Sequence, residues 1–206
     1  MTAIRCIVIG ALTIATAAPA LAAAQKKSAA GAAPQVAAPP AAQSLGRVDS
    51  WTAYAAQDST GKVCYLVGQP RRSEPAGFAR KPATAMVTHR PVEKIANVVS
   101  FVAGYPLKEG SEVALDTGDR KFELFTKDDS AWARTAELDK AIVATLAKGK
   151  QVVVKGLPQK GPPTTDTYAL AGFAKALALI DKACGVTREE KPAAKPASRS
   201  RKKVHH

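Results

Sequence analysis

The stretch Lys62-Val63-Cys64-Tyr65-Leu66-Val67 has the short, β-branched and apolar composition of a buried β-strand. Side chains alternate between the two faces of a strand, so Cys64 shares a face with Leu66. A second cysteine, Cys184, continues by four residues the apolar stripe of the segment Phe173–Ala183, which has helical spacing. Both thiols should therefore face the interior, and we expect this last helix to pack on the early strand.

Pairing of Cys64 with Cys184 would close a loop of 120 residues, which is 184 minus 64. In the chain-entropy model, closing a loop of that size stabilises a fold by roughly 4 to 5 kcal/mol. A reactive thiol and a metal site are the competing interpretations, but two distant cysteines without a neighbouring histidine support neither. We predict one long-range disulfide that fastens the C-terminal helix to the sheet.

Residues 1–24 contain, in order, the parts of a secretory signal peptide. Arg5 precedes the apolar run Ile7–Ala15, Pro19 breaks the run, and small residues follow as far as Ala24. The run is shorter than the roughly 20 residues that span a bilayer, so an uncleaved membrane anchor is the weaker interpretation. We expect a mature protein that does not span the membrane and is periplasmic, secreted or surface-associated, in compartments where disulfides persist.

Composition divides the rest of the chain into three parts. Residues 25–46 are mostly Ala, Pro, Gln and Ser and offer almost nothing large to bury, so we predict a linker. Residues 47–185 are numerous enough for one domain with its own core. Residues 186–206 are rich in Lys, Arg, Pro and Ala, which predicts a disordered basic tail.

The formal net charge of the chain is +13. Residues 47–184 hold 20 Lys or Arg and 15 Asp or Glu, a balance of +5, and residues 187–206 hold seven and two, again +5. A basic tail beside a mildly basic domain favours contact with anionic surfaces, and salt weakens such contact. We expect the partner to be an envelope component or a host-cell surface, reached through anionic lipid or glycan, and not nucleic acid, since an exported protein does not meet the chromosome. The alternative is a tail that only keeps the protein solvated.

Short β-type segments bounded by turn residues dominate the domain. Two segments, Ala136–Lys148 and Phe173–Ala183, instead place apolar residues at helical spacing and stop at a glycine. We predict a mainly β fold, an antiparallel β-sandwich or small barrel with two short helices. The expected strands are Val48–Ala55, Lys62–Val67, Ala83–His89, Asn97–Val102, Ser111–Leu115, Lys121–Thr126 and Gln151–Lys155.

Catalytic, cofactor and metal motifs do not stand out. His89 is the sole histidine between residues 47 and 185, and a single histidine is a weak candidate for a general base without a partner nucleophile. We predict no cofactor and a non-enzymatic interaction protein. The alternative is a periplasmic hydrolase or glycan-processing enzyme of unrecognised type, in which His89 or a carboxylate lines a pocket. The candidate partner-binding residues are Arg71, Arg72, Thr164, Thr165 and Asp166, the last three in an expected polar loop, 164–167.

Several short sequence motifs resemble those of a known family. They are Cys64-Tyr65-Leu66-Val67-Gly68-Gln69-Pro70, Val87-Thr88-His89-Arg90-Pro91, Gly104-Tyr105-Pro106-Leu107-Lys108-Glu109-Gly110-Ser111, Ala131-Trp132-Ala133, Val152-Val153-Val154-Lys155-Gly156, and the run from Thr164 to Phe173 that leads to Cys184. In order and content the domain resembles the invasion-associated locus B family of exported alphaproteobacterial proteins. The resemblance implies a periplasmic or surface-associated protein with no established reaction, named for host-cell entry, and its cysteine pair corresponds to Cys64 and Cys184. The loop Gly156–Pro163 differs from the sequence pattern of the family because it contains prolines. These prolines predict a stiffer loop.

Overall fold

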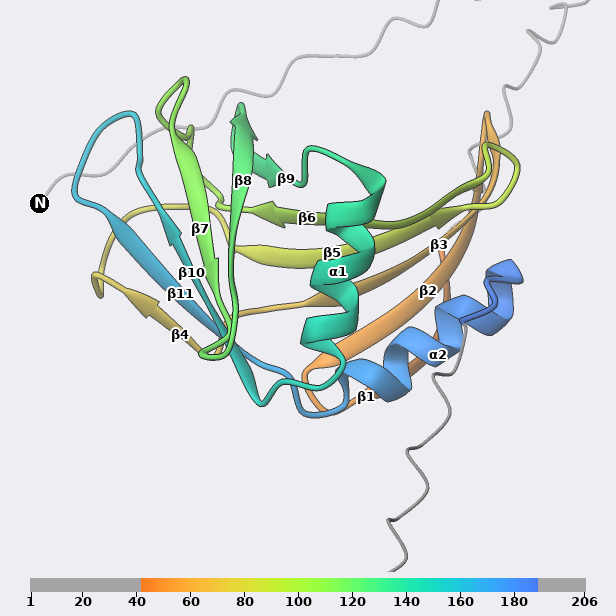
Figure 1. Cartoon of the computed structure of the whole chain (residues 1–206). Coiled ribbons are helices and arrows are strands. Elements are labelled where there is room, and N and C mark those ends of the chain that lie inside the picture. Colours follow the sequence, from red (N-terminus) through yellow and green to blue (C-terminus); the bar gives the residue numbers. More distant parts are fainter. Residues whose placement is uncertain (1–41, 189–206) are drawn as a thin grey trace, which may run out of the picture. The chain divides into compact units, whose positions relative to one another are not determined.

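The computed structural model describes residues 42–188, which contain one antiparallel sheet and two helices (Figure 1). The order of strands across the sheet is β1-β2-β3-β5-β6-β9-β8-β7-β10-β11-β4. The sheet is not closed, because β1 and β4 form its two edges. The elements are β1 (Gln43–Val48), β2 (Trp51–Asp58), β3 (Gly61–Gly68), β4 (Arg72–Glu74), β5 (Thr84–Arg90), β6 (Ile95–Val102), β7 (Glu112–Asp116), β8 (Lys121–Lys127), β9 (Ser130–Trp132), α1 (Ala136–Leu146), β10 (Gln151–Gly156), β11 (Thr164–Ala169) and α2 (Phe173–Cys184).

The predicted class, mainly β with two helices, is confirmed, and several boundaries need correction. The single strand expected over Val48–Ala55 is two strands, because a turn at Asp49 and Ser50 separates β1 from β2. Strand β1 also begins at Gln43, inside the range 25–46 that was predicted as linker. The loop expected over residues 164–167 is wrong, because these residues belong to β11.

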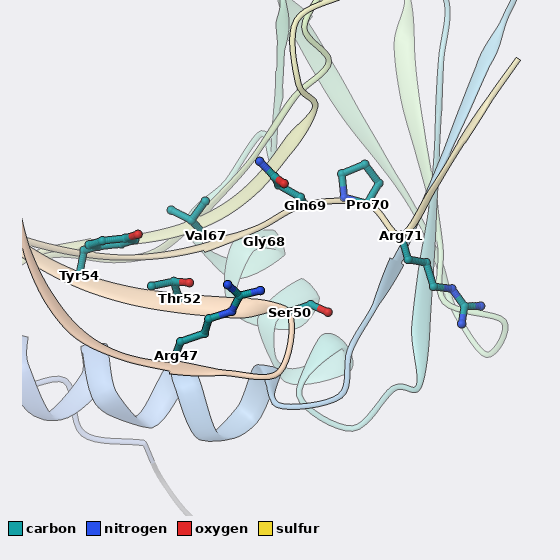
Figure 2. Close-up of a pocket in the computed structure, with 9 residues that line it drawn as sticks. All are labelled: Arg47, Ser50, Thr52, Tyr54, Val67, Gly68, Gln69, Pro70 and Arg71. Atoms are coloured by element: carbon teal, nitrogen blue, oxygen red, sulfur yellow. The ribbon is translucent and has the colours of Figure 1, made fainter. Parts of the chain in front are cut away.

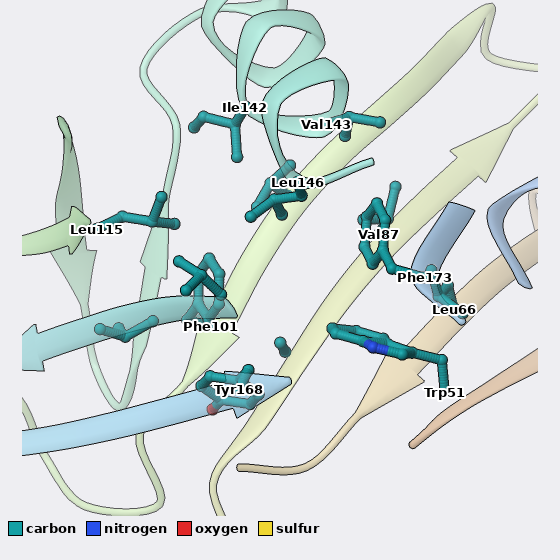
Figure 3. Packing of buried hydrophobic residues seen from close by; sticks show 14 of the residues in the cluster. Trp51, Leu66, Val87, Phe101, Leu115, Ile142, Val143, Leu146, Tyr168 and Phe173 are labelled. Carbon is teal, nitrogen blue, oxygen red and sulfur yellow. The ribbon is translucent and has the colours of Figure 1, made fainter. Parts of the chain in front are cut away.

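The two halves of the sheet pack their inner faces against each other. Phe101 of β6 and Tyr168 of β11 lie far apart in the strand order, yet their ring centroids are 5.7 Å apart in an edge-on arrangement. Both are buried in one apolar cluster that includes Leu115 and Leu124. The sheet therefore curls around its own core (Figures 1 and 3).

Both helices contribute to this same core. Helix α1 packs against β6, and α2 packs against β1, β2, β3 and β5. Phe173 at the start of α2 meets the Trp51 ring edge-on, with centroids 4.9 Å apart, and Leu66 lies beside them (Figure 3). Strands β1, β2, β3, β5, β6 and β9 each have a side that points away from the two helices. We call this side of the sheet the open face.

The helix boundaries follow their capping residues. The Thr135 side chain accepts a hydrogen bond from the N–H of Leu138, which makes Thr135 the N-cap of α1. Gly185 ends α2 with a φ of 66°, a left-handed conformation that glycine adopts without penalty. Neither of the two helices within residues 42–188 is long and apolar enough to cross a membrane.

The predicted disulfide joins Cys64 of β3 to Cys184 of α2, with Cα atoms 6.0 Å apart. Cys64 is buried and shares the helix side of β3 with Leu66, as the strand pattern predicted. The Lys62 ammonium also donates to the carbonyl of Ala183, 2.5 Å away. The last turn of α2 is thus held to β3 by a covalent bond and by a hydrogen bond.

Candidate functional site

The candidate site is a hollow on the open face where β1, β2 and the end of β3 meet (Figure 2). It has a volume of about 390 Å³, and its lining holds two arginines and no carboxylate. The lining residues are Arg47, Ser50, Thr52, Tyr54, Val67, Gly68, Gln69, Pro70 and Arg71. Such a lining suits a ligand that carries negative charge.

A tight turn brings Arg47 to the hollow. Asp49, between β1 and β2, has a φ of 52°, in the left-handed region that aspartate tolerates better than most residues. The turn places Arg47 directly opposite Thr52 in the β1–β2 ladder. Their side chains share the open face, while Trp51 faces the core.

Arg71 reaches the hollow from the segment that follows β3. Gly68 ends β3 against the Trp51 ring, where a Cβ atom would lie 2.5 Å from the indole. Pro70 lacks a backbone donor and cannot continue the ladder. The N–H of Arg71 then donates to the carbonyl of Thr167 in β11 at 2.9 Å, which fixes the position of Arg71 at the rim.

Both arginines of the hollow carry positive charge that no carboxylate of residues 42–188 pairs with. Nε of Arg47 donates to the backbone carbonyl of Asp49 at 3.1 Å, and Nη2 of Arg71 donates to Oε1 of Gln151 at 2.8 Å. Figure 2 shows the Arg47 side chain turned toward the hollow, whereas the Arg71 side chain extends away from it, toward Gln151. A carboxylate, sulfate or phosphate placed here would receive charge-assisted hydrogen bonds.

Arg72, predicted together with Arg71, lies outside the hollow. Its Nη2 forms an ion pair with Oε1 of Glu74 at 2.6 Å, and both side chains are largely exposed. Arg72 begins β4, whereas Arg71 precedes the strand and bonds Gln151, so the two side chains have different partners. The charge of Arg72 is partly compensated by Glu74, which makes Arg71 the stronger candidate of the two.

Thr164 and Asp166 point into the protein. Asp166 receives hydrogen bonds from both terminal nitrogens of Arg80 and, at 2.6 Å, from the hydroxyl of Ser73. The hydrogen bond to Asp166 raises the pKa of Arg80, which favours the charged form of the guanidinium group. Thr164 shares a hydrogen bond with the hydroxyl of Tyr105 and is 1% exposed. These two residues hold β11 in place and are not accessible to a partner.

Thr165 faces the other side of β11 and is half-buried opposite Glu74 of β4. It lies on β11, next to the edge strand β4, and apart from the hollow. The five candidate residues therefore do not form one site. Only Arg71 lines the hollow, and Arg47, which the sequence did not single out, is its counterpart.

His89 is 0% exposed, and both of its ring nitrogens are occupied. The N–H of Asn97 donates to Nδ1 at 2.9 Å, so Nε2 carries the proton and donates to Oδ1 of Asp181, also at 2.9 Å. Burial raises the pKa of Asp181, but hydrogen bonds from His89 and Arg188 outweigh it and hold that pKa below its usual value. His89 therefore links β5 to α2, and this geometry gives no support to a role as general base. Among residues 42–188, no group of three or more His, Cys, Asp or Glu side chains is placed to hold a metal ion.

Comparisons with known proteins agree with the fold. The model of the invasion associated locus B (IalB) protein family matches residues 51–181. The crystal structure of invasion associated protein b from Bartonella henselae superposes with a TM-score of 0.50 at 18% sequence identity, covering 70% of this chain and 98% of that chain. A search of curated proteins found no match. The family match spans more than half of the chain, so the protein belongs to the invasion associated locus B (IalB) family.

Proposed function

We propose that this protein is an exported, non-enzymatic interaction protein of the periplasm or cell surface, which binds an anionic component of the cell envelope or of a host-cell surface. The observation that carries the proposal is the hollow with Arg47 and Arg71, whose charges no carboxylate of residues 42–188 pairs with. The disulfide suggests an extracytoplasmic protein. The name of the family supports a contribution to host-cell association.

The basic C-terminal sequence supports the same partner chemistry. Residues 187–206 hold seven Lys or Arg and two Asp or Glu, so they would add long-range attraction to an anionic surface. Attraction of this kind weakens as ionic strength rises, because the Debye length falls to about 8 Å at physiological salt. We propose that the tail brings the protein to the surface and that the hollow makes the specific contact.

The test is retention of the mature protein on isolated envelope vesicles, measured by co-sedimentation at low and physiological salt. The decisive variant is Arg47→Gln with Arg71→Gln, which should lower retention at least about tenfold, because charge-assisted hydrogen bonds contribute about 1.5–3 kcal/mol each. Arg120→Gln with Arg134→Gln removes the same charge from exposed positions elsewhere and should change retention little.

A third variant ends the chain after Arg188, which keeps the contact of Arg188 with Asp181 at 2.5 Å. It separates the contribution of the tail from that of the hollow. Retention that depends on neither salt nor the two arginines of the hollow would refute the proposal. Crosslinking in the native envelope then identifies what is bound.

A further inference from the structure

The open face is apolar over a wide area beyond the hollow. A groove of about 560 Å³ lies on it, between β3 and β9. The apolar residues that line the groove are Val63, Tyr65, Met86, Ile95, Val98, Val102 and Trp132. An antiparallel sheet with one solvated face normally carries polar residues there, so an extended apolar lining marks a binding surface.

Strand register connects the hollow to this groove in one row of side chains. The row begins at Arg47, and each residue is the direct cross-strand partner of the next. At about 4.8 Å between neighbouring strands, the row covers roughly 24 Å. Its members in order are Arg47, Thr52, Val67, Met86, Ser100 and Trp132.

A stacked pair of aromatic rings joins the two concavities along a second row. Tyr54 lines the hollow and Tyr65 lines the groove, and their ring centroids are 5.2 Å apart at an interplanar angle of 21°. Val67 and Met86, which are cross-strand partners, make the same connection in the first row. No charged residue interrupts either connection.

The charge on this surface lies at one end. Arg90 lines the far side of the groove, but its Nη1 pairs with Asp58 at 2.7 Å and lies 3.5 Å from Glu93. The unpaired positive charge belongs to Arg47 and Arg71 at the other end. The surface therefore carries unpaired positive charge at one end and a mainly apolar groove beyond it, which is the complement of an anionic amphiphile.

We infer that the open face binds a single anionic amphiphile, with its acidic head group at Arg47, with Arg71 at the rim of the hollow, and with its alkyl chain along Val67, Met86 and Val98. This inference rests on the proposed function and names the class of ligand: a phosphorylated or otherwise acidic lipid. The hollow and the groove each have a volume within the roughly 300–1,000 Å³ of small-molecule sites. Charge at the head gives orientation, and burial of the chain gives most of the affinity.

The test is calorimetric binding of alkyl phosphates of increasing chain length, each below its critical micelle concentration, to the mature protein. Burial of each methylene should strengthen binding roughly fourfold until the groove is filled. Inorganic phosphate and neutral dodecyl maltoside serve as the head-only and chain-only probes. We expect dodecyl phosphate to bind at least tenfold more tightly than either.

Variants assign the two ends of the ligand. Arg47→Gln with Arg71→Gln should remove the advantage of dodecyl phosphate over dodecyl maltoside, and Arg120→Gln with Arg134→Gln should not. Met86→Gln with Val98→Thr keeps side-chain size and should flatten the dependence on chain length. Thermal unfolding of each variant shows whether it folds.

Three outcomes would overturn the inference. If inorganic phosphate binds as tightly as dodecyl phosphate, the groove does not contribute to binding. In that case the proposed function still holds if retention on envelope vesicles depends on Arg47 and Arg71. Equal binding of dodecyl phosphate and dodecyl maltoside would mean that the arginines do not select the head. A protein that sediments as a dimer, and as a monomer after Met86→Gln with Val98→Thr, would make this face an interface between two copies.

Discussion

Removal of the disulfide should lower the stability of the domain by an amount that the structure allows us to estimate. The perturbation is Cys64→Ala with Cys184→Ala, which avoids placing a hydroxyl at two buried positions. The closed loop spans 120 residues. Closing a loop of that length removes about 16 cal/mol/K from the entropy of the unfolded chain, which stabilises the fold by about 5 kcal/mol at 25 °C.

Other contacts hold α2 after the disulfide is removed, so we expect a destabilised domain that still folds. The Nε2 of His89 bonds Asp181 at 2.9 Å, and the Lys62 ammonium bonds the carbonyl of Ala183. Phe173 and Ile180 remain packed in the core. For a domain of roughly 150 residues, a loss of about 5 kcal/mol lowers Tm by about 10–20 °C.

The assay is thermal and urea unfolding followed by circular dichroism, with and without a phosphine reductant. Wild-type protein should lose stability in the reductant by the same amount as the double-alanine variant, and the variant should not respond to the reductant. Thiol titration of unfolded samples verifies that reduction is complete. A wild-type Tm that stays constant when Cys64 and Cys184 titrate as free thiols would refute the reasoning.

Two further predictions concern single positions in the core. Burial raises the pKa of Asp139 from 3.8 to about 6, although its Oδ1 accepts the N–H of Val99 at 2.8 Å. The folded protein binds the proton of the Asp139 carboxyl more tightly than the unfolded chain does, so the free energy of unfolding should fall by ~2 kcal/mol as pH rises from 4 to 6.5. Asp139→Asn should remove this pH dependence. Glu137→Gln, a control at an exposed position of the same helix, should leave it unchanged. Gly68→Ala should lower the free energy of unfolding by about 2 kcal/mol in urea titrations, because its Cβ would lie 2.5 Å from the Trp51 ring; an unchanged midpoint would show that the ring moves aside freely.

The sequence predicted those elements whose periodicity is local. Strand β3 and helix α2 both follow from the spacing of a few neighbouring residues, and so does the orientation of Cys64 and Cys184 toward each other. The short strands β4 and β9 were missed because three residues do not establish an alternation.

The remaining errors have a common physical cause, which is a partner distant in the sequence. Thr164–Ala169 is polar enough to suggest a loop, yet Asp166 is stabilised inside by Arg80, 86 residues away. Arg47 gave no local signal, because its place in the hollow depends on the register of β1 against β2 and of β2 against β3. A pattern within one strand does not determine which strand lies beside it.

The central claim is that the open face, and not the helix side, contacts an anionic partner. The most direct measurement is a map of amide chemical shifts in the ¹⁵N-labelled mature protein titrated with dodecyl phosphate. We expect the largest changes along the row from Arg47 through Thr52 and Val67 to Met86, and at Arg71. Changes confined to α1 and α2, or the same map with inorganic phosphate alone, would contradict the account.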